Sequence, residues 1–205
     1  MNENEGNYVP FGAKIYTLAY RFSQSTDLER YTQAIKIKCQ NLGISGKDSK
    51  MGTHLTVLPP FYATEAEAKR YAAIAKLAIG LFEETRKKIV INGIGWFEAI
   101  EKDEKSMDAL HLVVKLPKGY TDSVERLKSS TLFKWVHKPA QGKAVDPLYS
   151  PHIHIIEGEG VKALTEPHKK YFDLLVGGRS FALGPLNLFE KIEPSEAPFW
   201  KQVLV

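Results

Sequence analysis

Two segments of this 205-residue chain repeat the same pattern 98 positions apart. In each, a histidine opens a short run of alternating polar and apolar residues, His54-Leu55-Thr56-Val57 and His152-Ile153-His154-Ile155. Each run is followed by a helical pattern and then by a β-rich segment, which ends in Phe97-Glu98-Ala99-Ile100 in the first half and in Phe189-Glu190-Lys191-Ile192 in the second. An internal repeat of this kind predicts two similar lobes, each presenting one histidine-bearing strand.

Within each run, alternate side chains point to opposite faces of a strand. His54 therefore shares a face with Thr56, and His152 shares one with His154, while the apolar residues between them point to a core. Because an unpaired imidazole is costly to bury, the polar faces need water or a cleft. One histidine of this kind would indicate a hydrogen-bonded core residue, but the same pattern in two strands favours a shared site.

Strands are predicted from apolar runs that end at proline, glycine or polar residues. Proline cannot donate to a β-ladder, so Pro59-Pro60 is expected to end the second strand and Pro185 to interrupt the last. No element is predicted for Glu193–Val205. The predicted strands are Ala13–Phe22, Thr53–Leu58, Ile89–Ile100, Leu110–Leu116, Pro151–Ile156 and the extended region Arg179–Ile192.

Helices are predicted where apolar residues recur at spacings of three and four. The first two begin at the capping boxes Thr26-x-x-Glu29 and Thr64-x-x-Glu67, and Gly43 suits the end of the first. Two further helices are expected over Asp122–Trp135 and Thr165–Leu175. The apolar stripe of the second helix is expected to be Tyr71, Ile74, Leu77, Ala78, Leu81 and Phe82.

Composition restricts the class of protein. Hydrophobic residues make up 43% of the chain and charged residues 25%, which is typical of globular proteins and excludes disordered and collagen-like chains. No apolar run approaches the roughly 18 residues of a membrane span, and the first residues lack the basic and apolar regions of a secretory signal. The single cysteine, Cys39, cannot form an internal disulfide or a thiolate metal cluster, so we expect a cytoplasmic protein.

The net charge of +4 arises from 28 basic and 24 acidic residues that are interspersed along the chain. This balance weakly favours a phosphate-bearing partner. No block of lysine and arginine marks a nucleic-acid-binding arm, so a mixed, solvated surface is expected. Neither membrane association nor an obligate protein partner is inferred.

The two histidine-bearing runs resemble the paired H-x-[T/S] motifs of the two-histidine (2H) phosphoesterases, the superfamily of LigT-like RNA 2′,3′-cyclic phosphodiesterases. His54-Leu55-Thr56, preceded by Gly52-Thr53, matches the first motif in full. Ser150-Pro151-His152-Ile153-His154-Ile155 is similar to the second, but it has His154 where the family carries threonine or serine. The resemblance spans residues 13–192, although only the two motifs are specific. It implies an α+β fold with two pseudo-symmetric antiparallel sheets flanked by helices and a central cleft, in a single domain of two lobes over residues 1–205.

The resemblance also implies a phosphodiesterase that needs no metal ion or other cofactor. His54 and His152 would be its acid/base pair, because an imidazole pKa near 6.5 suits both tasks at neutral pH. Thr56 and His154 would bind the phosphate, because a hydroxyl and an imidazole N–H both donate hydrogen bonds. The expected substrate is a nucleotide or oligonucleotide, carrying either a 2′,3′-cyclic phosphate at an RNA end or the cyclic backbone of a signal that phage anti-defence members of the family destroy.

Other residues carry weaker indications. Tyr149 lies just before the second motif in a predicted long loop, His137–Ser150, and is a candidate for stacking on a nucleobase. His111 is interpreted as structural, although the alternation of its segment allows it to share the histidine-bearing sheet surface. Surface or packing roles are expected for Phe61, Trp96, Trp135, His137, Lys138, Lys143 and His168.

Two alternatives remain open. A metal-dependent enzyme would coordinate Zn²⁺ or Fe²⁺ through His152-x-His154-x-x-Glu157 with His54 or His111. The predicted helices disagree with an all-β cupin, and Ile155-Ile156 stand where a metallo-β-lactamase pattern requires Asp-His. A non-catalytic nucleotide-binding module would keep the cleft, but it would not need two intact histidines.

Overall fold

The computed structural model describes residues 11–22, 27–44, 46, 51–83, 88–97, 108–129, 150–158, 160–192 and 200–205. Its strands are β1 (Lys14–Arg21), β2 (His54–Ala63), β3 (Lys88–Phe97), β4 (Ala109–Lys115), β5 (His152–Glu157), β6 (Ser180–Ala182), β7 (Leu186–Lys191) and β8 (Trp200–Val203). Its helices are α1 (Asp27–Asn41), α2 (Glu65–Glu83), α3 (Lys118–Ser129), α5 (Glu166–Val176) and the short 3₁₀ helix η1 (Val161–Ala163). Across these ranges, no helix has both the length and the apolar character needed to cross a membrane.

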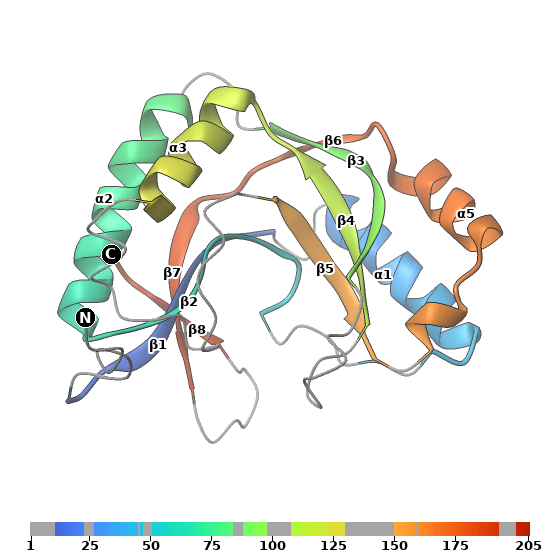
Figure 1. Ribbon diagram of the computed structural model, residues 1–205, viewed down its shortest axis with the longest axis horizontal. Coiled ribbons are helices and arrows are strands. Elements are labelled where there is room, and N and C mark those ends of the chain that lie inside the picture. The colour runs from blue at the N-terminus through green and yellow to red at the C-terminus, as the bar shows by residue number, and fades with distance from the viewer. Residues whose placement is uncertain are drawn as a thin grey trace, which may run out of the picture.

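The strands form two antiparallel four-stranded sheets, as the α+β prediction expects. Sheet A has the strand order β2-β1-β7-β8, and sheet B has the order β5-β4-β3-β6. The two histidine-bearing strands, β2 and β5, occupy equivalent ends of these orders. Figure 1 shows α2 and α3 on the side of sheet A and α1 and α5 on the side of sheet B. The internal repeat thus corresponds to two lobes with matching strand orders.

Each half of the chain contributes to both lobes. β3 follows α2 but pairs with β4 in sheet B, and β7 follows β6 of sheet B but pairs with β1 in sheet A. This second crossing occurs around Pro185, where the sequence predicts an interruption. Helix α1 joins two strands of sheet A yet packs against β5, and Tyr120 of α3 donates a hydrogen bond of 3.0 Å to the hydroxyl of Tyr20 in β1. One buried hydrophobic cluster includes residues of both sheets.

Strand β2 is longer than the sequence predicts. The expected end at Leu58, before Pro59-Pro60, is wrong, because the strand continues to Ala63. β2 is the terminal strand of sheet A, so within the described residues only one of its edges pairs, and the missing proline N–H groups are tolerated there. Its register with β1 also shifts on both sides of Leu18, the partner of Leu58. The prolines therefore lie beside an irregular part of the ladder.

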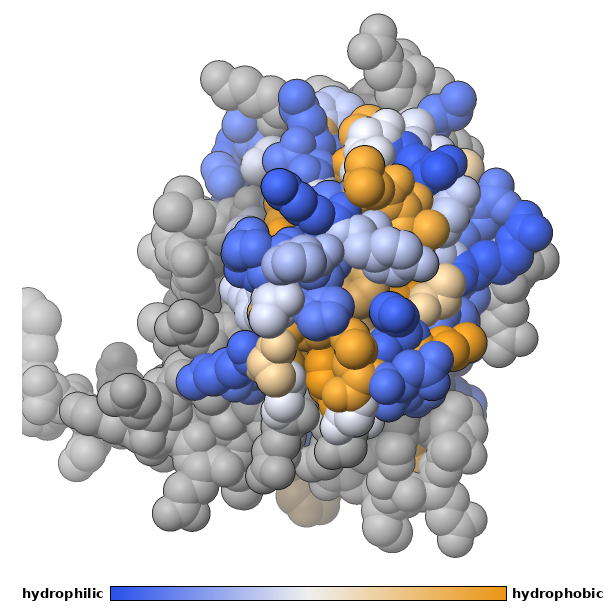
Figure 2. Space-filling view, turned by 90° about the vertical axis from the view of Figure 1, so that its right-hand side faces the viewer, coloured by the Kyte–Doolittle hydropathy of each residue, from blue (hydrophilic) through white to orange (hydrophobic). Residues whose placement is uncertain are grey.

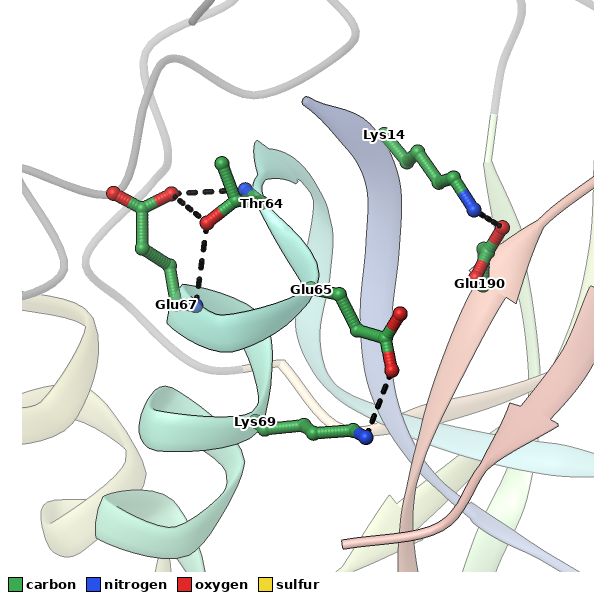
Figure 3. A network of polar contacts seen from close by, with 6 residues as sticks. All are labelled: Lys14, Thr64, Glu65, Glu67, Lys69 and Glu190. Carbon is green, nitrogen blue, oxygen red and sulfur yellow. Dashed lines mark hydrogen bonds and ion pairs between the residues drawn. The ribbon is translucent and has the colours of Figure 1, made fainter. Parts of the chain in front are cut away.

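Helix α2 begins at the predicted capping box but buries a different face. The backbone N–H of Thr64 donates to the Glu67 carboxylate at 2.8 Å, and the Glu67 N–H donates to the Thr64 hydroxyl at 3.4 Å (Figure 3). The predicted stripe is wrong at Leu77, which is 75% exposed. The spacing between packed elements depends on the side chains at the contact, so small residues let α2 lie close to sheet A. Over residues 65–79, the part of α2 whose side chains are described, the buried residues are Ala68, Ala72, Ala75 and Ile79.

The ends of other helices and strands can also be compared with the predictions. Helix α3 begins at Lys118, four residues before the predicted start, and β8 forms where no element is predicted. Gly43 follows the end of α1 with φ of +78°, a conformation that glycine adopts without steric strain. The predicted cap Thr26 and most of the predicted loop His137–Ser150 lie outside the described residues.

Candidate active site

The two histidine motifs begin the strands β2 and β5. These strands belong to different sheets, and they contact each other where the two lobes meet. The positive charges of His154 and His152 both lower the pKa of His54, so both imidazoles of β5 lie within electrostatic reach of the imidazole on β2. Two motifs that are 98 positions apart in the chain therefore lie together in the molecule.

Burial alternates along both strands in the predicted way. The apolar residues are buried in the hydrophobic cluster, and the polar residues are partly exposed on the opposite face of each strand, which we call the histidine face. The buried residues are Leu55, Val57, Ile153 and Ile155. The partly exposed residues are His54, Thr56, His152 and His154. The histidine face thus presents imidazoles at the surface, while the neighbouring apolar residues anchor both strands in the core.

Both leading histidines make the same local hydrogen bond. Nδ1 of His54 donates to the carbonyl oxygen of Gly52 at 2.8 Å, and Nδ1 of His152 donates to the carbonyl oxygen of Ser150 at 3.0 Å. A carbonyl only accepts, so in each ring Nδ1 carries the hydrogen and Nε2 of the neutral imidazole has a lone pair. Gly52 adopts φ of +75°, in the region that favours glycine, at the turn that presents its carbonyl to His54.

The environment of the site favours neutral imidazoles. Burial above all, together with the charges of His154, His152 and Arg21, lowers the pKa of His54 to about 4, against the opposing effect of the Gly52 hydrogen bond. Burial also lowers the pKa of His152, against the Ser150 hydrogen bond. In the free protein at neutral pH, both rings are therefore neutral, with a hydrogen on Nδ1 and none on Nε2.

A third histidine of the second lobe lies against the motif. His111 of β4 is the cross-strand partner of His154 on β5. Its ring centroid lies 5.4 Å from that of His152, with the ring planes at 68°. Burial, followed by the charges of His152 and His154, lowers the pKa of His111 to about 4. The contact between His111 and His152 could not be predicted from the sequence. The alternation of polar and apolar residues indicates the face on which His111 lies, but it does not indicate the register between β4 and β5.

A cation lies beside the first motif. Arg21, the last residue of β1, is the cross-strand partner of His54. Its guanidinium lies about 4 Å from the position that a side chain at Gly52 would occupy. The charge of Arg21 lowers the pKa of His54. Arg21 is not among the residues predicted from the sequence, because the sequence of one strand does not indicate which residues of a neighbouring strand will lie opposite.

The weaker candidates lie elsewhere. Phe61 is only 1% exposed in the core. Trp96 is adjacent to Gly95, the partner of His111, so it points to the opposite face of β3, where Lys169 of α5 lies 4.0 Å from its ring centroid. The candidates outside the described residues are Trp135, His137, Lys138, Lys143 and Tyr149.

Two structural observations bear on the remaining candidates. His168 caps α5 by accepting a hydrogen bond from the backbone of Thr165 at 3.1 Å. Within the described ranges, no group of three or more histidine, cysteine, aspartate or glutamate residues is arranged to hold a metal ion.

Solved structures resemble this chain over nearly its whole length. TT0787 of Thermus thermophilus is 14% identical, with 93% of this chain and 95% of that chain covered and a TM-score of 0.53. E. coli LigT in complex with 3′-AMP is 12% identical, with 93% and 94% covered and a TM-score of 0.53. Kluyveromyces marxianus Usb1 is 11% identical, with 96% and 100% covered and a TM-score of 0.52.

No protein-family model and no curated protein sequence matches this chain. These three proteins are members of the 2H phosphoesterase superfamily, and at these identities the likeness concerns the fold. The chain therefore has the 2H phosphoesterase fold, with its two histidine motifs on the terminal strands of the two sheets.

Proposed function

We propose that this protein is a metal-independent phosphoesterase that cleaves a cyclic phosphodiester of a nucleotide or oligonucleotide, with His54 and His152 as its acid/base pair. The observation that carries the proposal is the matched pair of Nδ1 hydrogen bonds to Gly52 and Ser150. Each bond selects one tautomer and leaves Nε2 for proton transfer. Phosphodiester cleavage needs one base and one acid, and the two strands supply one imidazole for each role.

The reaction uses the two rings in opposite protonation states. In the hydrolysis of a 2′,3′-cyclic phosphate, the neutral imidazole accepts a proton from water at Nε2 while the water oxygen bonds to phosphorus. The P–O bond to one ribose oxygen breaks, and the imidazolium of the other histidine donates its Nε2 proton to that oxygen. The product is a nucleoside monophosphate end, and the two histidines have exchanged protonation states. The ribose oxygen that leaves decides which ring starts as the acid.

Groups around the two rings suit an anionic phosphate. The Thr56 hydroxyl and the His154 imidazole lie on the histidine face and have N–H or O–H donors for the non-bridging oxygens. Arg21 adds a fixed positive charge beside His54. A bound phosphate anion favours imidazolium over imidazole, so substrate binding raises the low pKa values of the free protein. The proton that the acid needs is thus taken up together with the substrate.

The proposed substrate class is nucleotidic. LigT and Usb1, which share this fold, were solved with 3′-AMP and with uridine monophosphate. Cleavage by two imidazoles requires only a phosphodiester with a leaving oxygen that one of them can protonate. A 2′,3′-cyclic phosphate at an RNA end and the backbone of a cyclic oligonucleotide both meet this requirement, and the proposal includes both.

The proposal is tested by a substrate panel with and without a chelator. The panel contains 2′,3′-cyclic nucleotides, cyclic di- and trinucleotides and 2′-5′ linked oligonucleotides, assayed with wild type, His54→Ala, His152→Ala and the control His168→Ala. We expect chelator-resistant cleavage of at least one cyclic substrate and a loss of about 10²-fold or more in kcat for each of the first two variants. His168→Ala is expected to retain wild-type turnover, since its side chain caps α5.

Three results would count against the proposal. Turnover abolished by the chelator would indicate a metal enzyme. Retention of near-wild-type turnover by His54→Ala or His152→Ala would remove the acid/base assignment. Binding of the nucleotides without cleavage of any of them would indicate a binding module.

A further inference from the structure

The two lobes differ at one matched position beside their motifs. The row of cross-strand partners through the third motif residue is Thr56, Ala19 and Asn187 in sheet A. The equivalent row in sheet B is His154, His111 and Gly95. The strand next to the first motif thus offers a methyl group, whereas the strand next to the second motif offers an imidazole. We propose that His111 is a positioning residue, which holds the His152 ring in its reactive orientation within a slot that Gly95 keeps open.

The contact between His111 and His152 supplies the constraint. The ring of His111 is 7% exposed and meets the His152 ring in an edge-to-face arrangement, with centroids 5.4 Å apart. The hydrogen bond from Nδ1 to the carbonyl of Ser150 aligns one edge of the His152 ring, but it breaks when the ring turns about its Cβ–Cγ bond. A buried ring packed against its side restricts this rotation, so Nε2 of His152 is held in one direction.

Gly95 makes room for the His111 ring. A Cβ at position 95 would overlap Nε2 of His111 and would lie 2.8 Å from its Cε1 and 2.9 Å from Cγ2 of Val113. Gly95 is not among the glycines with positive φ, so its backbone does not require glycine. The absence of a side chain there is instead explained by the close approach of His111. The bulky side chain of His111 therefore depends on the absence of a side chain at Gly95.

The ionisation of His111 suits a positioning role. Its pKa is lowered to about 4, first by burial and then by the charges of His152 and His154. The ring is consequently neutral near neutral pH, and it packs against His152 without adding a second positive charge beside the acid/base pair. The contact between His111 and His152 is a feature of the geometry, whereas its expected effect on turnover depends on the proposed function.

The kinetic test compares four variants. His111→Ala removes the ring, His111→Leu keeps its bulk without its nitrogens, and Gly95→Ala places a methyl group against the ring. We expect His111→Ala and Gly95→Ala each to lower kcat about tenfold or more, with KM within about threefold of wild type, because a small misplacement of a catalytic group is costly. His111→Leu is expected to retain most of kcat. In the double variant, Gly95→Ala is expected to add little to His111→Ala, because the overlap with the ring is gone and only the contact with Cγ2 of Val113 remains.

A spectroscopic test does not depend on turnover. The imidazole ¹⁵N shifts of His152 report its tautomer, and we expect one tautomer with hydrogen on Nδ1 in wild type and a mixture in His111→Ala. Val114→Ala, a truncation of a buried residue on the opposite face of β4, is the control for general destabilisation. It is expected to leave the His152 shifts unchanged.

The kinetic and spectroscopic experiments can fail independently, so they distinguish the positioning role of His111 from the proposed function. Wild-type protein that cleaves no substrate would end the proposed function, but the ¹⁵N shifts would still test the contact. Unchanged His152 shifts in His111→Ala would overturn the positioning role, as would a kcat within twofold of wild type. Loss of activity in His111→Leu equal to that in His111→Ala would also overturn it, since bulk alone would then not suffice.

Discussion

The chemistry of the individual site residues is set mainly by burial. Burial is the largest cause of the lowered pKa of His54, His111 and His152, and the neighbouring positive charges act in the same direction on His54 and His111. A charged imidazole is disfavoured at all three positions until an anion arrives. An empty site and one that holds an anion would therefore differ in protonation, because a nearby negative charge makes the imidazolium form favourable.

His154 is the motif residue at which this sequence differs from the 2H phosphoesterase motifs, which have threonine or serine there. Replacing it, His154→Thr, restores a hydroxyl donor and removes the largest charge effect on His54. We expect the variant to keep turnover within about tenfold of wild type and the pKa of His54 to rise. Measured rates and an NMR titration of His54 check both parts. An inactive variant that still binds the substrate would mean that His154 itself transfers protons.

The lowered pKa values predict an acid-shifted pH profile. In the free protein few molecules carry the proton that the acid must donate at pH 7, so kcat/KM should rise as pH falls from 7 and peak below about 6.5, the ordinary histidine value. It should fall again where the base becomes protonated. The maximum of kcat should lie at higher pH, because bound phosphate stabilises the imidazolium. Initial rates on a 2′,3′-cyclic nucleotide measure both, and a kcat/KM maximum at or above pH 7 would contradict the assignment.

At the residue scale, the sequence predicts the face that each motif presents. Alternation alone places His54 with Thr56 and His152 with His154, and the structure has the same faces. Arg21 and His111 could not be selected in this way. Their relevance depends on the register between strands, and register comes from the packing of the whole sheet.

Among the elements, the two histidine-bearing strands share a position at the end of their sheets. A terminal strand has one edge without a ladder, which explains how β2 accommodates Pro59-Pro60 and why its first residues can face the other lobe. The helices that follow these strands are stabilised locally. Figure 3 shows the three hydrogen bonds between Thr64 and Glu67 at the start of α2, beside the exposed Glu65–Lys69 pair.

The capping box provides a stability test at this scale. Thr64→Ala removes the side-chain acceptor of the Glu67 N–H and the hydroxyl contact with its carboxylate. We expect the free energy of unfolding to fall by about 1 kcal/mol. Lys69→Ala, which breaks only the exposed Glu65–Lys69 pair, is the control, and it should have a smaller effect. Urea unfolding measures both, and a cost for Lys69→Ala equal to or above that for Thr64→Ala would refute the capping assignment.

The sequence predicts elements well where the signal is local. Capping boxes, the glycine after α1 and the break at Pro185 depend on a few adjacent residues. The buried face of α2 and the extent of β2 depend on what packs against them, so they were mispredicted. β8 is a short strand that pairs only with β7 within the described residues, and its segment carries no periodicity strong enough to be recognised.

At the scale of the molecule, the two lobes interlock. Strands from each half of the chain take part in both sheets, and one hydrophobic cluster includes residues of both. The exposed surface over α5 is mixed, and Figure 2 shows hydrophobic and hydrophilic residues interspersed on this side of the molecule. Leu174 of α5 is one of the exposed hydrophobic residues. The internal repeat predicts the pair of lobes, but it does not reveal the exchange of strands between them, because a repeat specifies similar units and not their connections.

The buried histidines also predict how the fold responds to acid. His54 and His111 have pKa values of about 4 in the folded protein and about 6.5 in an unfolded chain. Between these values the unfolded chain binds more protons, so the free energy of unfolding should fall as pH falls from about 6.5 to about 4. His111→Leu removes one of the two groups and should lose less stability over that range. Urea unfolding at several pH values tests this, and parallel curves for the two proteins would contradict it.

The central claim is that two imidazoles from opposite halves of the chain act on one phosphoryl group. The most direct test is to titrate a nucleoside 3′-monophosphate into ¹⁵N-histidine-labelled protein and to measure the pKa of His54 and of His152 at each concentration. The account predicts that both pKa values rise, and that both saturate with the same dissociation constant. A response from only one of the two rings at saturation, or from neither, would contradict it.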